Sequence, residues 1–428
     1  MLELIDGREQ LAPVHIPRPE TSAGGIAVAG AVAGIISEVR LHGDEAVRRF
    51  TAEFDGAEVT ELKVPEGAIA AAGEAAAPEL IEALRTMAER LRSTCERQVI
   101  EPWMDRRADE SVGELVRPLR RVGLYVPGGR AAYPSSVIMT AIPAQIAGVE
   151  QLAVASPPGP DGEVSPAVLA ACSVAGISEV YRMGGAQAIA ALAYGTDLVR
   201  PVEKIVGPGN LYVTEAKRQV RGWCGIDSEA GPTEIAIVAD GSADPAFVAA
   251  DLIAQAEHGP DGAHVLITWS PQFAEAVLGE LDAQVIMHPR TEEVEDALVA
   301  GGTAVLVRDL RHALETVNAF APEHLELIFD RAEDALPMVQ SAGSVFVGPY
   351  TPVPVGDYTG STNHVLPSGG TARWSSGLSV RDFIKVIYVS GMERSALERM
   401  EPHIDALAEA EGLPAHIASV RLRLGDPS

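Results

Sequence analysis

The sequence predicts an α/β protein in which helices cover parallel β-sheets. Short apolar runs typical of buried strands recur along the chain, and Ala-rich segments with small and apolar residues at helical spacing lie between them. The expected strands cover residues 122–126, 152–156, 203–206, 234–239, 264–268, 303–307 and 344–347. The clearest helical patterns between them span residues 166–175 and 245–257. Strands that alternate with helices in this way form parallel sheets with helical crossovers.

Two stretches of the chain resemble each other. One begins with LAVASPPGP and ends with ISEVYRMGG, and the other begins with IAIVADGSADP and ends with AHVLIT. Each has the order strand, Asp- or Pro-containing turn, Ala-rich helix, strand. This order favours two related α/β units, but any protein with repeated strand–helix–strand units would show some of it, so duplication stays open.

The rest of the chain has other patterns. About the first 115 residues are expected to be mainly helical, with amphipathic segments at 44–54 and 79–97. Residues 350–371 are dense in Pro, Gly, Thr and Asn, and a loop of this length favours a functional role. Residues 378–424 are expected to form a small, largely helical tail segment.

The composition excludes several classes of protein. The 428 residues include 33 Lys or Arg and 60 Asp or Glu, so the formal net charge is −27. This charge argues against non-specific binding to nucleic acid or an anionic membrane, and its simplest role is solubility. Cys95, Cys172 and Cys224 are far apart, which indicates neither a disulfide framework nor a structural zinc site. The chain also begins without a basic signal segment, and its longest apolar stretch, 23–36, is too short for a membrane span, so we expect a cytoplasmic protein.

Several glycine turns suggest a nucleotide site. The dinucleotide fingerprint G-x-G-x-x-G is absent, and the only G-x-G is at 207–209. Further glycine turns lie at 126–129, 183–185 and 230–232, where each could be an ordinary strand-to-helix turn. Taken together, with polar side chains nearby, they indicate a nucleotide site that departs from the usual fingerprint. The polar side chains are those of Tyr125, Gln187 and Asn210.

Four of the ten histidines have neighbours suited to chemistry: His258, His324, His364 and His416. Gln255 and His258 share one face of an expected helix, and Asp357 lies in the loop that also holds His364. Two His, one Asp and a Gln amide oxygen would suit zinc, with manganese or cobalt as replacements. No short motif such as H-E-x-x-H supports a metal site, so ordinary surface or core histidines remain the alternative.

Glu323 and His324 form a second candidate, an acid–base pair. Histidine has an unperturbed pKa of about 6.5, so it can act as a base near neutral pH. Adjacent Glu and His also occur by chance, so this dipeptide alone leaves both interpretations open.

Long segments of the chain, in order, resemble the histidinol dehydrogenase family from about residue 43 to residue 424. The segments that carry the resemblance are 122–149, 183–195, 204–213, 226–237, 252–260, 318–327, 356–367, 375–380 and 411–416. The resemblance implies oxidation of L-histidinol through L-histidinaldehyde to L-histidine with two NAD⁺. It also implies that His324 is the general base for the alcohol, and that Glu323 and His324 activate water for the aldehyde step.

The resemblance further implies a set of binding residues. One Zn²⁺ per subunit would be held by Gln255, His258, Asp357 and His416. The substrate pocket would be lined by Thr233, Gln255, His258, His324, Asp357, His364, Glu411 and His416. NAD⁺ would contact Tyr125, Gln187 and Asn210. None of the three cysteines lies in a matching motif, which argues against a covalent thiohemiacetal.

The family resemblance also implies the domain organisation. Two incomplete Rossmann-like α/β domains would be joined to small, mainly helical terminal segments in a domain-swapped homodimer with shared active sites. Residues 1–22 would be an N-terminal segment, and 23–122 with 234–377 would form the domain that carries the metal and catalytic residues. Residues 123–233 would form the NAD-contacting domain, and 378–428 the swapped segment.

Two alternative functions remain open beside this one. The first is a relative that oxidises another small alcohol, such as a sulfonated diol, and the second is a catalytically inactive scaffold or metal-binding protein. Glu411, His416 and Asp357 are all present, which favours histidinol, and no proposed base or ligand is lost.

Overall fold

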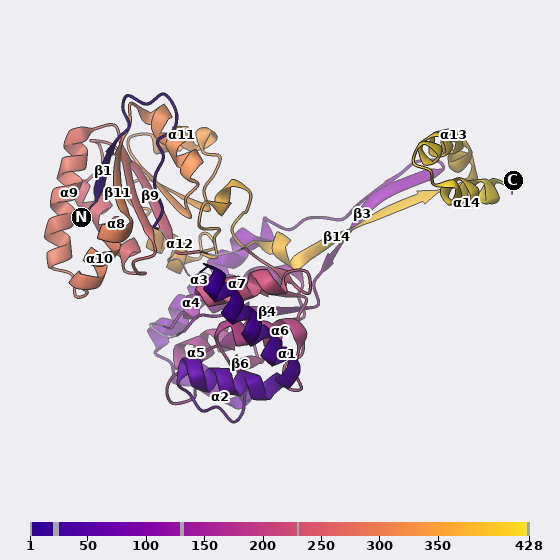
Figure 1. Ribbon diagram of the computed structural model, residues 1–428, viewed down its shortest axis with the longest axis horizontal. Helices are drawn as coiled ribbons and strands as arrows, with labels where there is room; N and C mark the ends of the chain where they lie inside the picture. The colour runs from indigo at the N-terminus through magenta and orange to yellow at the C-terminus, as the bar shows by residue number, and fades with distance from the viewer. Residues whose placement is uncertain (1, 20–24, 129–131, 229–230, 426–428) are drawn as a thin grey trace. The chain divides into compact units, whose positions relative to one another are not determined.

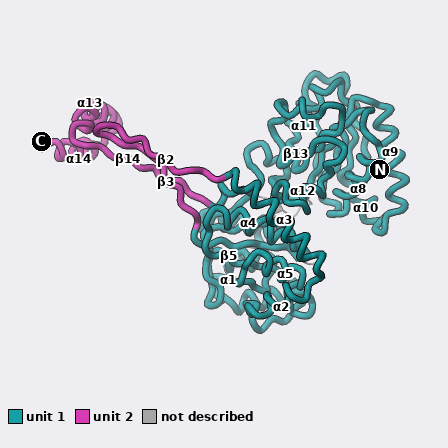
Figure 2. Tube along the Cα trace, turned by 180° about the vertical axis from the view of Figure 1, so that it is seen from behind, with its two compact units in different colours: residues 1–98, 120–383 teal, residues 99–119, 384–428 magenta. Residues whose placement is uncertain are grey.

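The computed structural model describes residues 2–19, 25–128, 132–228 and 231–425. The chain divides into two compact units, one made of residues 1–98 and 120–383 and the other of residues 99–119 and 384–428 (Figure 2). Among the described residues, no helix is long and apolar enough to cross a membrane.

A five-stranded parallel sheet lies in the first unit. Its strands are β4 (Arg121–Tyr125), β5 (Gln151–Ser156), β6 (Val180–Arg182), β7 (Lys204–Val206) and β8 (Gly225–Ile226), in the spatial order β6-β5-β4-β7-β8. The helices that follow them are α4 (Pro134–Ala147), α5 (Pro166–Val174), α6 (Gly185–Tyr194) and α7 (Leu211–Val220). Counted along the chain, the strand order is 3-2-1-4-5, which is the Rossmann order without its sixth strand.

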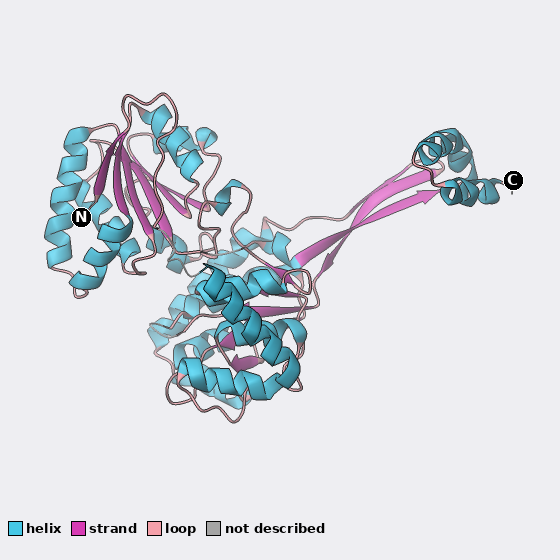
Figure 3. Ribbon diagram, in the orientation of Figure 1, coloured by secondary structure: helices cyan, strands magenta, loops and turns pink. Residues whose placement is uncertain are grey.

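A six-stranded parallel sheet forms the other half of the first unit (Figure 3). Its strands are β1 (Glu3–Asp6), β11 (Gly302–Leu306), β10 (Ala263–Thr268), β9 (Glu234–Ala239), β12 (His324–Ile328) and β13 (Ser344–Val347), in this spatial order. Apart from β1, the order is again 3-2-1-4-5. The shared order supports the sequence-based inference of two related α/β units, and it confirms the predicted fold class.

Helices cover both faces of the six-stranded sheet, because every residue of β9 and β10 is buried. Alternate residues of β9 enter different cores: Ile235 and Ile237 face one, and Ala236 and Val238 face the other. The helices of the first core are α8 (Pro245–Ala256), α9 (Pro271–Ile286), α10 (Thr291–Gly301) and α12 (Val353–Thr359). The second core contains α11 (Leu310–Phe320) and the 3₁₀ turn η1 (Ala332–Met338). Two shorter 3₁₀ turns follow, η2 (Thr371–Arg373) and η3 (Val380–Phe383).

The N-terminal helices pack differently from the expected domain division. These helices are α1 (Gly25–Asp55), α2 (Glu66–Ala75) and α3 (Pro78–Glu96). They contact α6, α5 and α4, and the apolar face of α1 shares one core with the five-stranded sheet, not with the sheet that carries residues 234–377 (Figure 1). Part of the expected N-terminal segment, residues 1–22, belongs to the six-stranded sheet and its core. Strand β1 pairs with β11, and Val14 and Ile16 are buried in the second core. An amphipathic pattern shows that a helix face must be covered, but it does not show which sheet covers it.

The second unit contains strands where the sequence indicated mainly helix. In the antiparallel order β14-β3-β2, β2 (Trp103–Arg106) and β14 (Ile384–Met392) flank β3 (Glu110–Pro118). Two helices follow, α13 (Arg394–Ala410) and α14 (Pro414–Leu424), so the predicted helical tail is correct only after residue 393. The Asp109 carboxylate, just before β3, accepts hydrogen bonds from Ser395 and Arg399 on α13. These bonds join α13 to the three-stranded sheet. The mainly helical interpretation of the first 115 residues is likewise wrong for β2 and β3.

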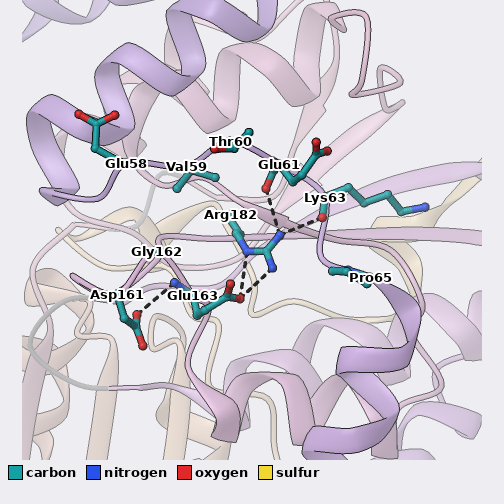
Figure 4. Close-up of a pocket in the computed structure, with 10 residues that line it drawn as sticks. All are labelled: Glu58, Val59, Thr60, Glu61, Lys63, Pro65, Asp161, Gly162, Glu163 and Arg182. Carbon is teal, nitrogen blue, oxygen red and sulfur yellow. Dashed lines mark hydrogen bonds and ion pairs between the residues drawn. The ribbon is translucent and has the colours of Figure 1, made fainter.

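A cavity of about 430 Å³ beside the five-stranded sheet shows how Arg182 on β6 connects the two loops around it (Figure 4). The buried guanidinium of Arg182 donates to the carbonyl oxygens of Glu61 and Lys63 at 3.0 and 2.9 Å, and to the Glu163 carboxylate at 2.8 Å. Its donors are therefore used within the protein, which makes Arg182 a structural residue of this cavity.

Candidate active site

A cavity of about 490 Å³ in the first unit brings together most of the predicted site residues. The predicted residues that line it are Asn210, Thr233, Gln255, His258, Glu323, His324, Asp357 and His364. Its size is typical of a small-molecule site. Tyr125 and Gln187 are not among its lining residues, and Glu411 and His416 belong to α13's C-terminal end and to α14 in the second unit.

The two sheets contribute opposite ends of their strands to this cavity. The five-stranded sheet contributes turns after the carboxyl ends of β4 and β7, at Gly128 and Gly209, where its strand order reverses. Open α/β sheets commonly bind ligands at this position. The six-stranded sheet instead contributes residues at the amino ends of β9 and β12, namely Thr233, Glu323 and His324.

The backbone of Glu234 holds both members of the acid–base pair. His324 Nδ1 lies 2.9 Å from the Glu234 carbonyl oxygen, which can only accept, so Nδ1 carries the proton. In the neutral ring, Nε2 is then the nitrogen that can accept a proton. Glu323 Oε2 accepts from the Glu234 amide at 2.9 Å and from the Thr233 hydroxyl at 2.8 Å. Pairing of β12 with β9 places these groups side by side.

Burial sets the protonation of both groups. It lowers the pKa of His324, opposed by the nearby Asp357 carboxylate, so the imidazole is neutral at neutral pH. Burial raises the pKa of Glu323 to about 8, although its hydrogen bonds from Glu234 and Thr233 act in the opposite direction. A carboxyl with this pKa can exchange a proton near neutral pH, as a general acid–base group must.

Gln255, His258 and Asp357 offer a set of donors suited to a metal. Gln255 Nε2 donates to Thr233 Oγ1, and His258 Nδ1 lies 3.3 Å from the Gln255 backbone oxygen, which leaves the His258 Nε2 atom for a ligand. Burial raises the pKa of Asp357, opposed by His324 and His258. One imidazole nitrogen, one carboxylate and an amide that can present its oxygen fit zinc by donor type.

This donor set is incomplete within the cavity. Among the described residues, no three His, Cys, Asp or Glu side chains stand close enough together to hold a metal ion. The predicted ligand set contains only two such residues here, His258 and Asp357, because its third member is an amide and its fourth, His416, lies in the second unit.

His364 lines the same cavity. Its Nε2 is 3.4 Å from Ser136 Oγ, and its Nδ1 is 3.9 Å from the Asp357 carboxylate. Burial lowers the pKa of His364 to about 4, so the ring is neutral and can hydrogen-bond a polar ligand without charge.

The predicted cofactor residues differ in their surroundings. The Asn210 side chain lines the cavity and caps α7 by accepting from the Val213 amide at 3.1 Å. The Tyr125 hydroxyl accepts from the Gly185 amide at 3.1 Å. The buried Gln187 amide has no hydrogen-bond partner among the described residues, and such a group needs a ligand or water.

Sequence reasoning missed Ser136, Tyr133 and Tyr358, which also line the cavity. Ser136 and Tyr133 fall inside segment 122–149, and Tyr358 directly follows Asp357, so their positions offered some signal. No feature of the sequence could indicate the role of the Glu234 backbone, because every residue has a carbonyl group and nearly every residue has an amide.

Two sheets of Rossmann strand order, with glycine turns and a buried neutral histidine at one cavity, are typical of α/β oxidoreductases. The family model for histidinol dehydrogenase matches residues 18–424. The histidinol dehydrogenase of Moorella thermoacetica is 46% identical over 426 residues, covering 99% of this chain and 100% of that protein. The chain belongs to the histidinol dehydrogenase family, and it is an oxidoreductase of that type.

Further relatives agree with this assignment. The histidinol dehydrogenase of Heliobacterium mobile is 47% identical, over 92% of this chain and 93% of that protein. The crystal structure of histidinol dehydrogenase from Elizabethkingia anophelis matches with a TM-score of 0.92 and 33% identity, over 99% of this chain and 98% of that one.

Proposed function

We propose that the protein oxidises L-histidinol to L-histidine through L-histidinaldehyde, with two NAD⁺ and one Zn²⁺ per subunit. The observation that carries this proposal is the tautomer of His324, whose Nδ1–H is held by the Glu234 carbonyl beside Glu323 and the candidate metal donors. The test is NADH formation from histidinol against other amino alcohols and diols. We expect two NADH per histidinol, and no turnover of histidinol would refute the assignment.

His324 serves the first oxidation as general base. Its Nε2 removes the hydroxyl proton of the alcohol while the carbinol carbon gives up its hydride, for which bound NAD⁺ is the acceptor. The Nδ1–H bond to Glu234 keeps the ring oriented throughout. The nearby Asp357 carboxylate stabilises the imidazolium that forms, since it favours the charged form of His324.

Glu323 and His324 serve the second oxidation by activating water. The Glu323 carboxylate removes a proton from water as the water oxygen attacks the aldehyde carbon, and the His324 imidazolium formed in the first oxidation donates its proton to the aldehyde oxygen, which gives the neutral hydrate. The neutral His324 then accepts a hydroxyl proton of the hydrate as the hydrate carbon gives up its hydride. Thr233 and the Glu234 amide hold one oxygen of Glu323, which leaves its other oxygen for water.

Gln255, His258 and Asp357, together with His416, would hold the zinc ion. When bound, the ion would orient the substrate by coordinating its imidazole and amino nitrogens. A chelator is expected to abolish turnover, and Zn²⁺ to restore it, because the substrate then loses its anchor. Steady-state assays with matched metal analysis check this. Full activity in a metal-free preparation would contradict the role of the metal.

We also propose that two subunits exchange their C-terminal segments in a homodimer, so that Glu411 and His416 complete the partner's site. The second unit supports this, because α14 buries none of its residues and Tyr388 on β14 is 82% exposed. A helix with no buried residue and an exposed aromatic side chain on so small a unit are consistent with a surface that a second subunit covers.

Mixing inactive variants tests this exchange. Dimers of His324→Asn and of His416→Ala are each expected to be inactive, whereas mixed dimers would contain one site with neither change if segments are swapped. Activity should therefore return to about one quarter of wild type after random reassociation. Co-purification of differently tagged subunits confirms that mixed dimers form, and inactive mixed dimers would contradict the swap.

We further propose a cytoplasmic enzyme that binds neither nucleic acid nor membrane. The net charge of −27 and the three buried, unpaired cysteines are consistent with this proposal.

A further inference from the structure

Three segments that carry the active-site residues meet at one carboxyl group, that of Glu326. Glu326 lies two residues after His324 on β12, so the two side chains are on the same face of the strand. Its Oε1 accepts from the Val353 amide at 3.0 Å, at the beginning of α12, which carries Asp357. The Glu326 carboxyl also makes a side-chain hydrogen bond with the carboxyl of Asp251 on α8, a helix that carries Gln255 one turn later.

The contact between the two carboxyl groups requires a proton. Glu326 is 1% exposed, and its Oε2 has no N–H or O–H donor among the described residues. Two buried carboxylates in contact would repel each other, whereas one shared proton converts the contact into a charge-assisted hydrogen bond. Burial and mutual repulsion raise the pKa of Glu326 well above its usual range, and burial raises that of Asp251 to about 6. Glu326 therefore donates to an ionised Asp251.

We propose that Glu326 and Asp251 form a carboxylic acid–carboxylate pair that positions α8 and α12 against β12 and thereby sets the spacing of Gln255, His258 and Asp357. The apolar surroundings favour this role, because Val353 and Phe346 share one buried core with the inner face of α8. If one carboxyl group of this buried pair lost its partner, the other would be left without a hydrogen bond in an apolar core, which destabilises the fold. The pair therefore favours one arrangement of the three segments. As far as it concerns the metal donors, the inference rests on the proposed function.

Two kinds of variant separate this pair from simple packing. Glu326→Gln keeps an acceptor for Val353 and a donor for Asp251, so it is expected to behave like wild type. Glu326→Leu fills similar volume but removes both bonds. Leu281→Ala on α9 is the matched control, because Leu281 is fully buried in the same core and contacts none of the metal donors by hydrogen bonding.

The first readout is amide hydrogen exchange in the metal-free full-length protein. Glu326→Leu should speed exchange in the segment 350–359 and in the last turn of α8, while Glu326→Gln should not. Leu281→Ala should speed exchange around α9 and leave 350–359 unchanged. Unchanged exchange in Glu326→Leu overturns the proposal, and so does the same pattern in Leu281→Ala.

The second readout is Zn²⁺ affinity measured by competition with a chelator. Glu326→Leu should bind Zn²⁺ about 10- to 100-fold more weakly, as expected when support behind metal ligands is lost, and Glu326→Gln should restore binding. Equal affinity in Glu326→Leu and wild type overturns the link to the metal donors. If wild type itself binds no Zn²⁺, the proposed function fails, and the exchange result still decides whether the pair positions the helices.

Discussion

Replacing His324 with Asn is expected to lower kcat for histidinol oxidation by about 10²- to 10⁴-fold, the usual contribution of a positioned general base. Asn can still donate to the Glu234 carbonyl, but it has no atom that takes up a proton in place of Nε2. Pre-steady-state NADH formation measures the alcohol step directly. A higher KM with an unchanged kcat would show that His324 binds substrate without acting as the base.

The matched control for this variant is His312→Asn. His312 is also fully buried in the first unit, where it bonds the Ala12 carbonyl at 2.9 Å, but it does not line the cavity. It should lower thermal stability and leave the alcohol step near its wild-type rate. A similar loss of rate in both variants would point to general loss of structure.

The pH dependence follows from the same geometry. Burial lowers the pKa of His324 from its ordinary value of 6.5, and a base works only when it is unprotonated. The acid limb of the kcat profile for the alcohol step should therefore lie below pH 6.5, and it should disappear in His324→Asn. An acid limb above this value would show that another group limits the step.

Glu323→Gln is expected to slow aldehyde oxidation by about 10²-fold or more and to affect the alcohol step much less. The Gln oxygen can still accept from Thr233 and Glu234, so the site keeps its shape while the water-activating carboxylate is lost. The yield should fall from two NADH per histidinol toward one, with aldehyde that can be trapped by a carbonyl reagent. An aldehyde step that is insensitive to this change would remove Glu323 from the mechanism.

Two further measurements sharpen this prediction. The pKa of Glu323 is raised to about 8, so the wild-type aldehyde step should accelerate with rising pH until about this value, where the carboxylate predominates. The variant should lack this dependence. Glu215→Gln makes the same substitution on α7, away from the cavity, and should change neither step.

The strands of the two parallel sheets show what patterning can reveal. Runs such as 152–156 and 234–239 are uniformly apolar or nearly so, and both form strands over these residues. By contrast, the apolar pattern did not predict β12, the strand that begins with His324. In β12, His324 and Glu326 alternate with leucines, and these polar residues are tolerated only because Glu234, Val353 and Asp251 meet them in the folded chain.

The second unit illustrates a different limit. Residues 384–392 pair with residues 110–118 through nine antiparallel positions, although more than 260 residues separate the two strands. Charged residues in β3 and the isolation of each strand along the chain hide this pairing, since a strand's partner is chosen by tertiary contacts.

The sequence by itself determined the α/β class, the family and the types of side chain available for chemistry, because apolar periodicity and long motifs are properties of residue identity. Only the tertiary structure decided that α1–α3 cover the five-stranded sheet, and that the six-stranded sheet presents the amino ends of its strands to the cavity. It also decided which nitrogen of His324 is free to accept a proton. That choice depends on the backbone carbonyl of Glu234, and a backbone carbonyl is the same in every residue, so no sequence pattern can mark it.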